Sequence, residues 1–179
     1  MNLCNECGLC CNGVMFHTVR LQPADSAKEL AALGLKLKRK KGAHYILQPC
    51  PAWRDCQCSI YAARPERCRV FECRQLQRVA AGETTEAAAL EKIRDVQRRV
   101  ALVHELLARS GSTSAKRPLA KRCEKIMAEP LDASSDPAAL ALRDDLTRAM
   151  QELNAILDTD FRLISIGASG AEEEPTVPS

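Results

Sequence analysis

Hydrophobic residues recur at helical spacing through most of the second half of the chain. Between Leu90 and Leu107, apolar residues step by threes and fours along the sequence. This period predicts one long helix with a buried stripe. Thr84 or Thr85 is placed to cap its start, and Gly111 is placed to end it.

Two further helices follow in the same half. A shorter one is predicted from about Pro118, with Cys123 on its apolar face. Asp136 followed by Pro137 is a strong start signal for a third helix. The buried stripe of that third helix is predicted at Leu142, Leu146, Met150, Leu153 and Leu157.

The first half lacks long periodic stretches and alternates between short apolar runs and turn residues. The basic run KLKRKK (36–41) is interpreted as a solvated loop that needs no function. The remaining pattern predicts short strands at 13–21, 44–50 and 58–61, a helix from Pro23 to Gly34, and a helix from Pro65 to about Ala81.

Cysteine is the residue type that changes this picture. Nine of the ten cysteines lie within residues 4–73, in the stretches CNECGLCC (4–11) and CPAWRDCQC (50–58) and at Cys68 and Cys73. We see neither a secretory leader nor an apolar run long enough to span a membrane, so we expect a cytoplasmic protein. In that compartment a dense cysteine pattern favours metal binding over disulfides.

These observations predict an α+β fold that is mostly α. We expect a small, metal-stapled, cysteine-rich unit of short strands and helices over residues 1–82. A helical region of three helices follows over 83–166, and a disordered acidic tail over 167–179.

The spacing of the cysteines suits thiolate ligation of zinc or of an iron–sulfur cluster, each of which takes up to four cysteines. A C-x2-C pair lets two thiolates reach one ion from a tight turn, which Gly8 helps to form. Adjacent side chains diverge, so Cys10 and Cys11 serve either different positions of one cluster or two separate ions. The later cysteines would complete the coordination from the other side.

A thiolate centre also needs positive charge nearby. Eight thiolates around two divalent ions leave a net charge of about −4 by simple addition. The segment RPERCR supplies Arg64, Arg67 and Arg69 beside Cys68. Cys68 is predicted in the first turn of a helix, where the helix dipole favours a thiolate.

CNECGLCC followed by CSIYAARPERCRVF resembles the CxxCxxCC family of zinc- or iron-chelating cysteine-cluster proteins, over about residues 4–76. Cys56 departs from the family pattern, and of Cys56 and Cys58 we favour Cys58 because it precedes Ile60 and Tyr61. The resemblance implies zinc or iron as ions or as an iron–sulfur cluster, held by Cys4, Cys7, Cys10, Cys11, Cys50, Cys58, Cys68 and Cys73.

Two functions remain open at this stage. One is a metal-binding protein without catalysis, which uses its helical part to pack against the centre or to meet a protein partner. The other is an iron–sulfur redox protein or an enzyme of protein modification, since flagellin lysine N-methylases carry a related cluster. The sequence contains no recognisable catalytic motif.

The other polar features suggest no further site. The net charge of +3 neither demands nor excludes a nucleic-acid partner. Six aromatic residues leave little for base stacking, so nucleic acid is not the expected partner, although the basic run 36–41 leaves RNA or an acidic partner open. We expect no membrane contact, since no apolar run is long enough to span one. Cys123 is interpreted as a small core residue, and His44 as a residue outside the centre. Trp53 is expected to shield the metal centre, with Tyr61 and Phe71 packed in the core beside it.

Overall fold

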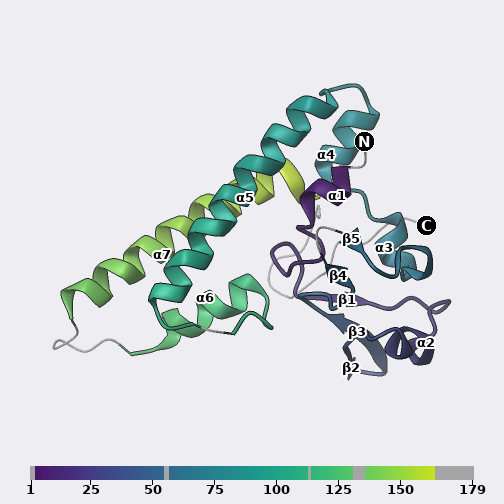
Figure 1. Cartoon of the computed structure of the whole chain (residues 1–179), viewed down its shortest axis with the longest axis horizontal. Coiled ribbons are helices and arrows are strands. Elements are labelled where there is room, and N and C mark those ends of the chain that lie inside the picture. The colour runs from purple at the N-terminus through teal and green to yellow at the C-terminus, as the bar shows by residue number, and fades with distance from the viewer. Residues whose placement is uncertain (1–2, 55–56, 113, 131–135, 164–179) are drawn as a thin grey trace.

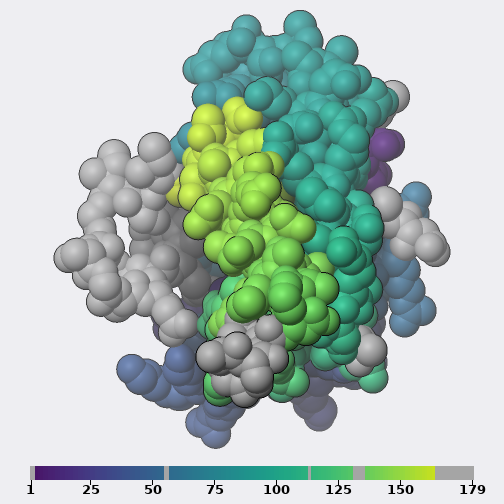
Figure 2. Space-filling view, turned by 90° about the vertical axis from the view of Figure 1, so that its left-hand side faces the viewer, coloured from purple at the N-terminus to yellow at the C-terminus, as the bar shows by residue number. Residues whose placement is uncertain are grey.

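The chain has an α+β fold in which helices predominate, as predicted (Figure 1). The computed structural model describes residues 3–54, 57–112, 114–130 and 136–163. Two long helices, α5 (Glu86–Arg109) and α7 (Pro137–Ile156), lie side by side and run in opposite directions (Figures 1 and 2). The shorter α6 (Leu119–Ala128) packs against both of them.

The sequence signals for these three helices are confirmed. Thr85 caps α5 by accepting a hydrogen bond from the Ala88 backbone N–H at 3.1 Å. Asp136 caps α7 in the same way for the Ala138 N–H at 3.0 Å. α7 continues into one π-helical turn, Leu157–Phe161, which buries the last apolar residues of the stripe.

A single helical core holds these helices to the N-terminus of the chain. We use this name for the buried cluster that includes Val96, Val103 and Leu153 from the long helices and Leu3 and Leu9 from the first residues. The prediction that a boundary falls at residue 82 stays a prediction, since residues on both sides of it share this core.

A second, smaller core lies under an antiparallel sheet of three strands in the order β1-β3-β2. These strands are β1 (Thr18–Arg20), β2 (Leu37–Lys40) and β3 (Ala43–Leu47). The strands β4 (Trp53–Arg54) and β5 (Gln57–Cys58) form a separate ribbon. The buried residues of this sheet core are Leu21, Leu30, Leu35, Ile46 and Ala52.

Short helical segments connect these layers. They are α1 (Leu3–Cys7), α2 (Ala27–Ala32), a 3₁₀ turn (Tyr61–Ala63), α3 (Glu66–Val70) and α4 (Arg74–Ala80). In Figure 1, α1 and α4 lie near one end of α5, and α3 lies beside the sheet. None of the described helices is both long and apolar enough to cross a membrane.

Several predictions of secondary structure in the first half were wrong in detail. The strand expected at 13–21 is confined to β1, because Asn12 and Gly13 form turns before it. The helix expected at Pro23 starts only after Ser26, because the Asp25 carboxylate accepts from the Gln22 N–H at 2.8 Å and holds residues 22–25 in a turn.

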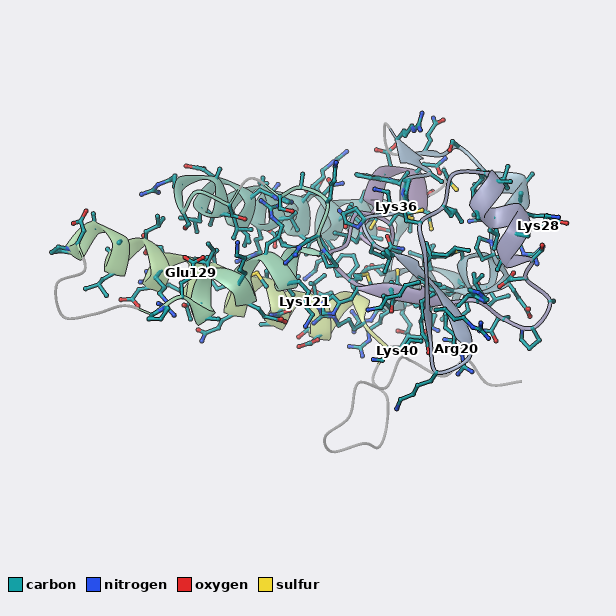
Figure 3. All side chains as sticks on the ribbon, turned by 90° about the horizontal axis from the view of Figure 1, so that it is seen from below. Arg20, Lys28, Lys36, Lys40, Lys121 and Glu129 are labelled. Atoms are coloured by element: carbon teal, nitrogen blue, oxygen red, sulfur yellow. The ribbon has the colours of Figure 1, made fainter. Side chains whose placement is uncertain are left out.

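The basic run 36–41, which was predicted to be a loop, instead contains the edge strand β2. This strand pairs with β3 along its length. Figure 3 labels Lys40 on β2 and Arg20 on β1, which flank the central strand. Leu37 at the start of β2 packs against the sheet core, whereas Lys38, Arg39 and Lys40 are exposed to water.

The helix predicted from Pro65 to Ala81 is two helices. α3 ends at Val70, Phe71 turns to an extended conformation, and α4 begins after Cys73. The strand predicted at 58–61 ends at Cys58. The tail predicted at 167–179 lies outside the described residues.

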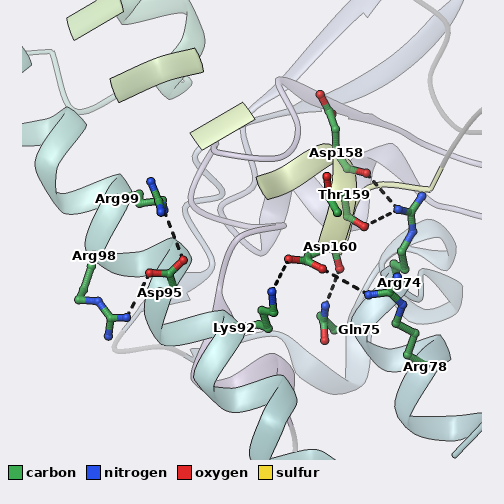
Figure 4. A network of polar contacts seen from close by, with 10 residues as sticks. All are labelled: Arg74, Gln75, Arg78, Lys92, Asp95, Arg98, Arg99, Asp158, Thr159 and Asp160. Carbon is green, nitrogen blue, oxygen red and sulfur yellow. Dashed lines mark hydrogen bonds and ion pairs between the residues drawn. The ribbon is translucent and has the colours of Figure 1, made fainter. Parts of the chain in front are cut away.

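The buried carboxylate of Asp160, in the π-helical turn after α7, bonds to residues of α4 and α5 (Figure 4). Asp160, which is 6% exposed, accepts from Arg78 Nη1 on α4 at 3.3 Å and from Lys92 Nζ on α5 at 3.0 Å. Its backbone carbonyl accepts from the buried Gln75 Nε2 at 2.8 Å. Arg74 adds hydrogen bonds to the carbonyls of Asp158 and Thr159.

We expect Asp160→Ala to lower the free energy of unfolding by about 1–3 kcal/mol, because a buried hydrogen-bonded acceptor is removed. Asp158→Ala is the matched control: its bond to Arg162 is an exposed i,i+4 pair and contributes about 0.5 kcal/mol or less. Urea denaturation of the two variants measures the difference. Equal losses would contradict the role of Asp160.

Candidate metal centre

Three distant stretches of the chain meet at one cavity of about 310 Å³. Its wall includes apolar residues of both cores, such as Leu9 and Ile46. The thiol side chains that line it are those of Cys4, Cys7, Cys10, Cys11, Cys50, Cys58, Cys68 and Cys73. The structure therefore brings all eight predicted ligands to one place.

The first four of these cysteines lie on α1 and the loop after it. Cys4 and Cys7 are three residues apart on the helix, so they lie on one side of it. Gly8 then adopts φ +65°, and its carbonyl accepts from the Cys11 and Asn12 N–H groups at 2.9 Å each. This turn places Cys10 and Cys11 in the wall of the cavity.

Backbone hydrogen bonds position Cys50 and Cys58, the cysteines of the second stretch. The Cys50 N–H donates to the Cys11 carbonyl at 2.7 Å, so the second stretch is bonded directly to the first. Cys58 faces Trp53 across the β4–β5 ribbon. Cys56 lies outside the described residues, so the choice between Cys56 and Cys58 stays a prediction.

The last two cysteines sit at the starts of the two short helices. Cys68 is in the first turn of α3, and Cys73 is the residue before α4. The Glu66 N–H of α3 donates to the Asp25 carboxylate at 2.9 Å, which ties α3 to the loop before α2.

Burial favours the neutral form of most thiols in this cavity by raising their pKa. Burial raises the pKa of Cys7 and of Cys11 to about 12, and that of Cys68 to about 11. Burial raises the pKa of Cys68 although this residue lies in the first turn of α3, as predicted. The contribution of the helix dipole to a Cys68 thiolate stays a prediction. A metal ion has to displace these protons when it binds, and its charge would stabilise the thiolates.

Positive charge is available at the rim. Arg64, Arg67 and Arg69 all line the cavity, as the sequence predicted. The Arg64 guanidinium partly offsets the rise in the pKa of Cys4 and of Cys68. It also stacks on the ring of Tyr61 at 3.7 Å. Tyr61 is 49% exposed, so its predicted place in the core was wrong, whereas Phe71 packs edge-on against Phe16 in the helical core.

The indole of Trp53 lies against Gly8 at the cavity wall. Its Nε1 is buried and has no hydrogen-bond partner among the described residues. A thiolate that binds metal accepts N–H donors, so this donor fits a charged sulfur centre. The sequence suggested that Trp53 shields the centre, but only the fold shows that its N–H lacks a partner.

The donor set fits zinc or iron, since clustered thiolates select these soft-binding metals. As placed, no three or more of the described His, Cys, Asp and Glu side chains form a group that could hold an ion, so ligation requires the thiols to turn inward. His44 is not among the residues of this cavity wall. Cys123 is 5% exposed in the helical core, as predicted.

Comparison with known proteins agrees with this geometry. Residues 3–99 match the model of the CxxCxxCC family, described as a putative zinc- or iron-chelating domain. The chain therefore belongs to this family of metal-chelating cysteine-cluster proteins. Neither the curated proteins nor the solved structures that were compared gave a match.

The contact between Gly8 and Trp53 can be tested by Gly8→Ala. A Cβ at this position would lie 2.6 Å from Trp53 Cζ2, too close for the rigid ring to accept. We expect a loss of metal and a stability loss about 1–3 kcal/mol larger than that of the control.

The control is Gly34→Ala, which shares the strain of a positive φ, +90°, but meets no atom within 4 Å. Metal content and urea denaturation are measured on both variants. If the two alanine variants behave alike, packing at Gly8 has no special part in the centre.

Proposed function

We propose that this protein holds zinc or iron, as ions or as an iron–sulfur cluster, through the eight cysteines of the cavity. The observation that carries the proposal is the convergence of eight thiols, from residues 4–11, 50–58 and 68–73, on the wall of one cavity. Arginine at the rim and an unpaired indole N–H complete the surroundings that a thiolate centre requires.

The metal acts here as a staple. Only five described residues form the buried sheet core, and so small a core contributes little stability by itself. Thiolate–metal bonds between the three stretches would supply the missing stabilisation, as they do in other small metal-dependent domains. The long helices then hold the N-terminal residues from the other side.

The direct experiment is metal analysis of protein purified without oxygen. We expect stoichiometric zinc in a colourless protein, or iron and sulfide in a brown one, and either result supports the proposal. A reduced, folded protein that contains neither metal and takes up neither would refute it.

Single substitutions test the ligands. Cys7→Ser and Cys68→Ser should each lower the metal content, because each removes one thiolate from the centre. Cys123→Ser is the control and should retain full metal with a stability loss of about 1 kcal/mol, since Cys123 lies in the helical core. Full metal content in Cys7→Ser would show that the assignment of this ligand is wrong.

Trp53→Phe tests the indole donor, because phenylalanine keeps an aromatic ring beside Gly8 but lacks the N–H. We expect about 10- to 100-fold weaker zinc affinity, the usual effect of removing a hydrogen bond to a ligand. Competition with a chelator measures the affinity. An unchanged affinity would mean that the indole only fills space.

A further inference from the structure

The eight cysteines of the cavity do not pack against the same part of the fold. Cys7, Cys10 and Cys73 pack against the helical core, whereas Cys50 and Cys58 pack against the sheet core. The cavity lies between the two cores and borders both.

Backbone contacts assign α1 to the helical side. α1 packs on α5, and Gln97 of α5 donates its side-chain amide to the carbonyls of Glu6 and Cys7, the former at 2.6 Å. α4, which Cys73 precedes, packs on α5 and on the π-helical turn. Cys4 and Cys7 on α1 therefore belong with Cys10 and Cys73.

Other contacts assign the remaining thiols to the sheet side. The Cys11 carbonyl accepts from the Cys50 N–H at 2.7 Å, which places the backbone of Cys11 beside the second stretch. Cys58 lies on the β4–β5 ribbon. α3, which carries Cys68, is tied to the loop before α2 by the hydrogen bond from the Glu66 N–H to the Asp25 carboxylate.

Resting on the proposed function, we propose that the cavity holds two metal centres, each bound by four thiolates. The helix-side set is Cys4, Cys7, Cys10 and Cys73, and the sheet-side set is Cys11, Cys50, Cys58 and Cys68. The adjacent Cys10 and Cys11 diverge into different centres and couple them through one peptide bond.

Two consequences follow from the division into two centres. Four thiolates around one divalent ion leave each centre at −2, and Arg64, Arg67 and Arg69 line the same cavity and can offset this charge. Each centre also fastens its own core, so loss of the sheet-side centre should loosen the sheet and leave α5 and α7 folded.

The test is titration of cobalt(II) into the reduced, metal-free full-length chain, followed by its visible tetrathiolate absorption. The original chain should bind two equivalents. Cys7→Ser/Cys10→Ser removes two thiols from one set and should keep one equivalent. Cys10→Ser/Cys58→Ser removes one thiol from each set and should keep no tetrathiolate site. Equal binding by the two double variants would overturn the division.

Hydrogen exchange adds a readout that is independent of metal counting. In Cys50→Ser/Cys58→Ser, amides of β1 and β3 should lose protection while those of α5 keep it. Loss of protection in both regions together would mean that one shared centre holds the whole fold.

A third measurement, cysteine alkylation of the original chain, needs no substitution. It tests the division into two sets even if a variant fails to fold. The original chain with one equivalent of zinc is alkylated briefly, and the protected cysteines are identified by mass spectrometry. Molecules with four protected cysteines should carry one complete set. Mixed sets, or protection of all eight together, would overturn the division. An original chain that takes up no zinc, cobalt or iron would instead refute the proposed function itself.

Discussion

Burial of many thiols at one place is the constraint on which this fold depends. Burial disfavours the thiolate forms of Cys7, Cys10 and Cys11, and neighbouring thiolates would repel them further, so the pKa of each of these three thiols is raised. A cation removes both penalties at once. Protein and metal are therefore complementary: the chain supplies soft donors that are costly to ionise alone, and the metal supplies the charge that makes ionisation favourable.

This constraint also explains how two cores of different size coexist. The helical core is large, with α5 and α7 in contact along their length, and its caps and apolar stripe are of the ordinary kind. The sheet core has few buried residues, and its strands are short. The cysteine cavity lies where the two meet, so a metal there joins the weaker part to the stronger one.

Much of this could be predicted from the sequence where the signals are local. Thr85 and Asp136 cap helices that begin where the sequence places them, and the stripe along 90–107 is buried. Errors arose where a distant contact replaced a local preference. β2 forms because β3 is available to pair with it, and the helix expected over 65–81 divides at Phe71, which packs against Phe16.

The sequence alone determined the chemistry of this protein: a set of thiols at ligand spacing, arginines beside them, and helices of known start and length. The tertiary structure decided which cysteines pack against which core, that Gly8 must leave room for Trp53, and that the indole N–H has no partner within the described part of the chain. The physical reason is the distance along the chain over which each kind of interaction acts. Spacing and capping act within a few residues, whereas the grouping of sulfur atoms depends on stretches that lie 40 to 70 residues apart and meet only when both cores have formed.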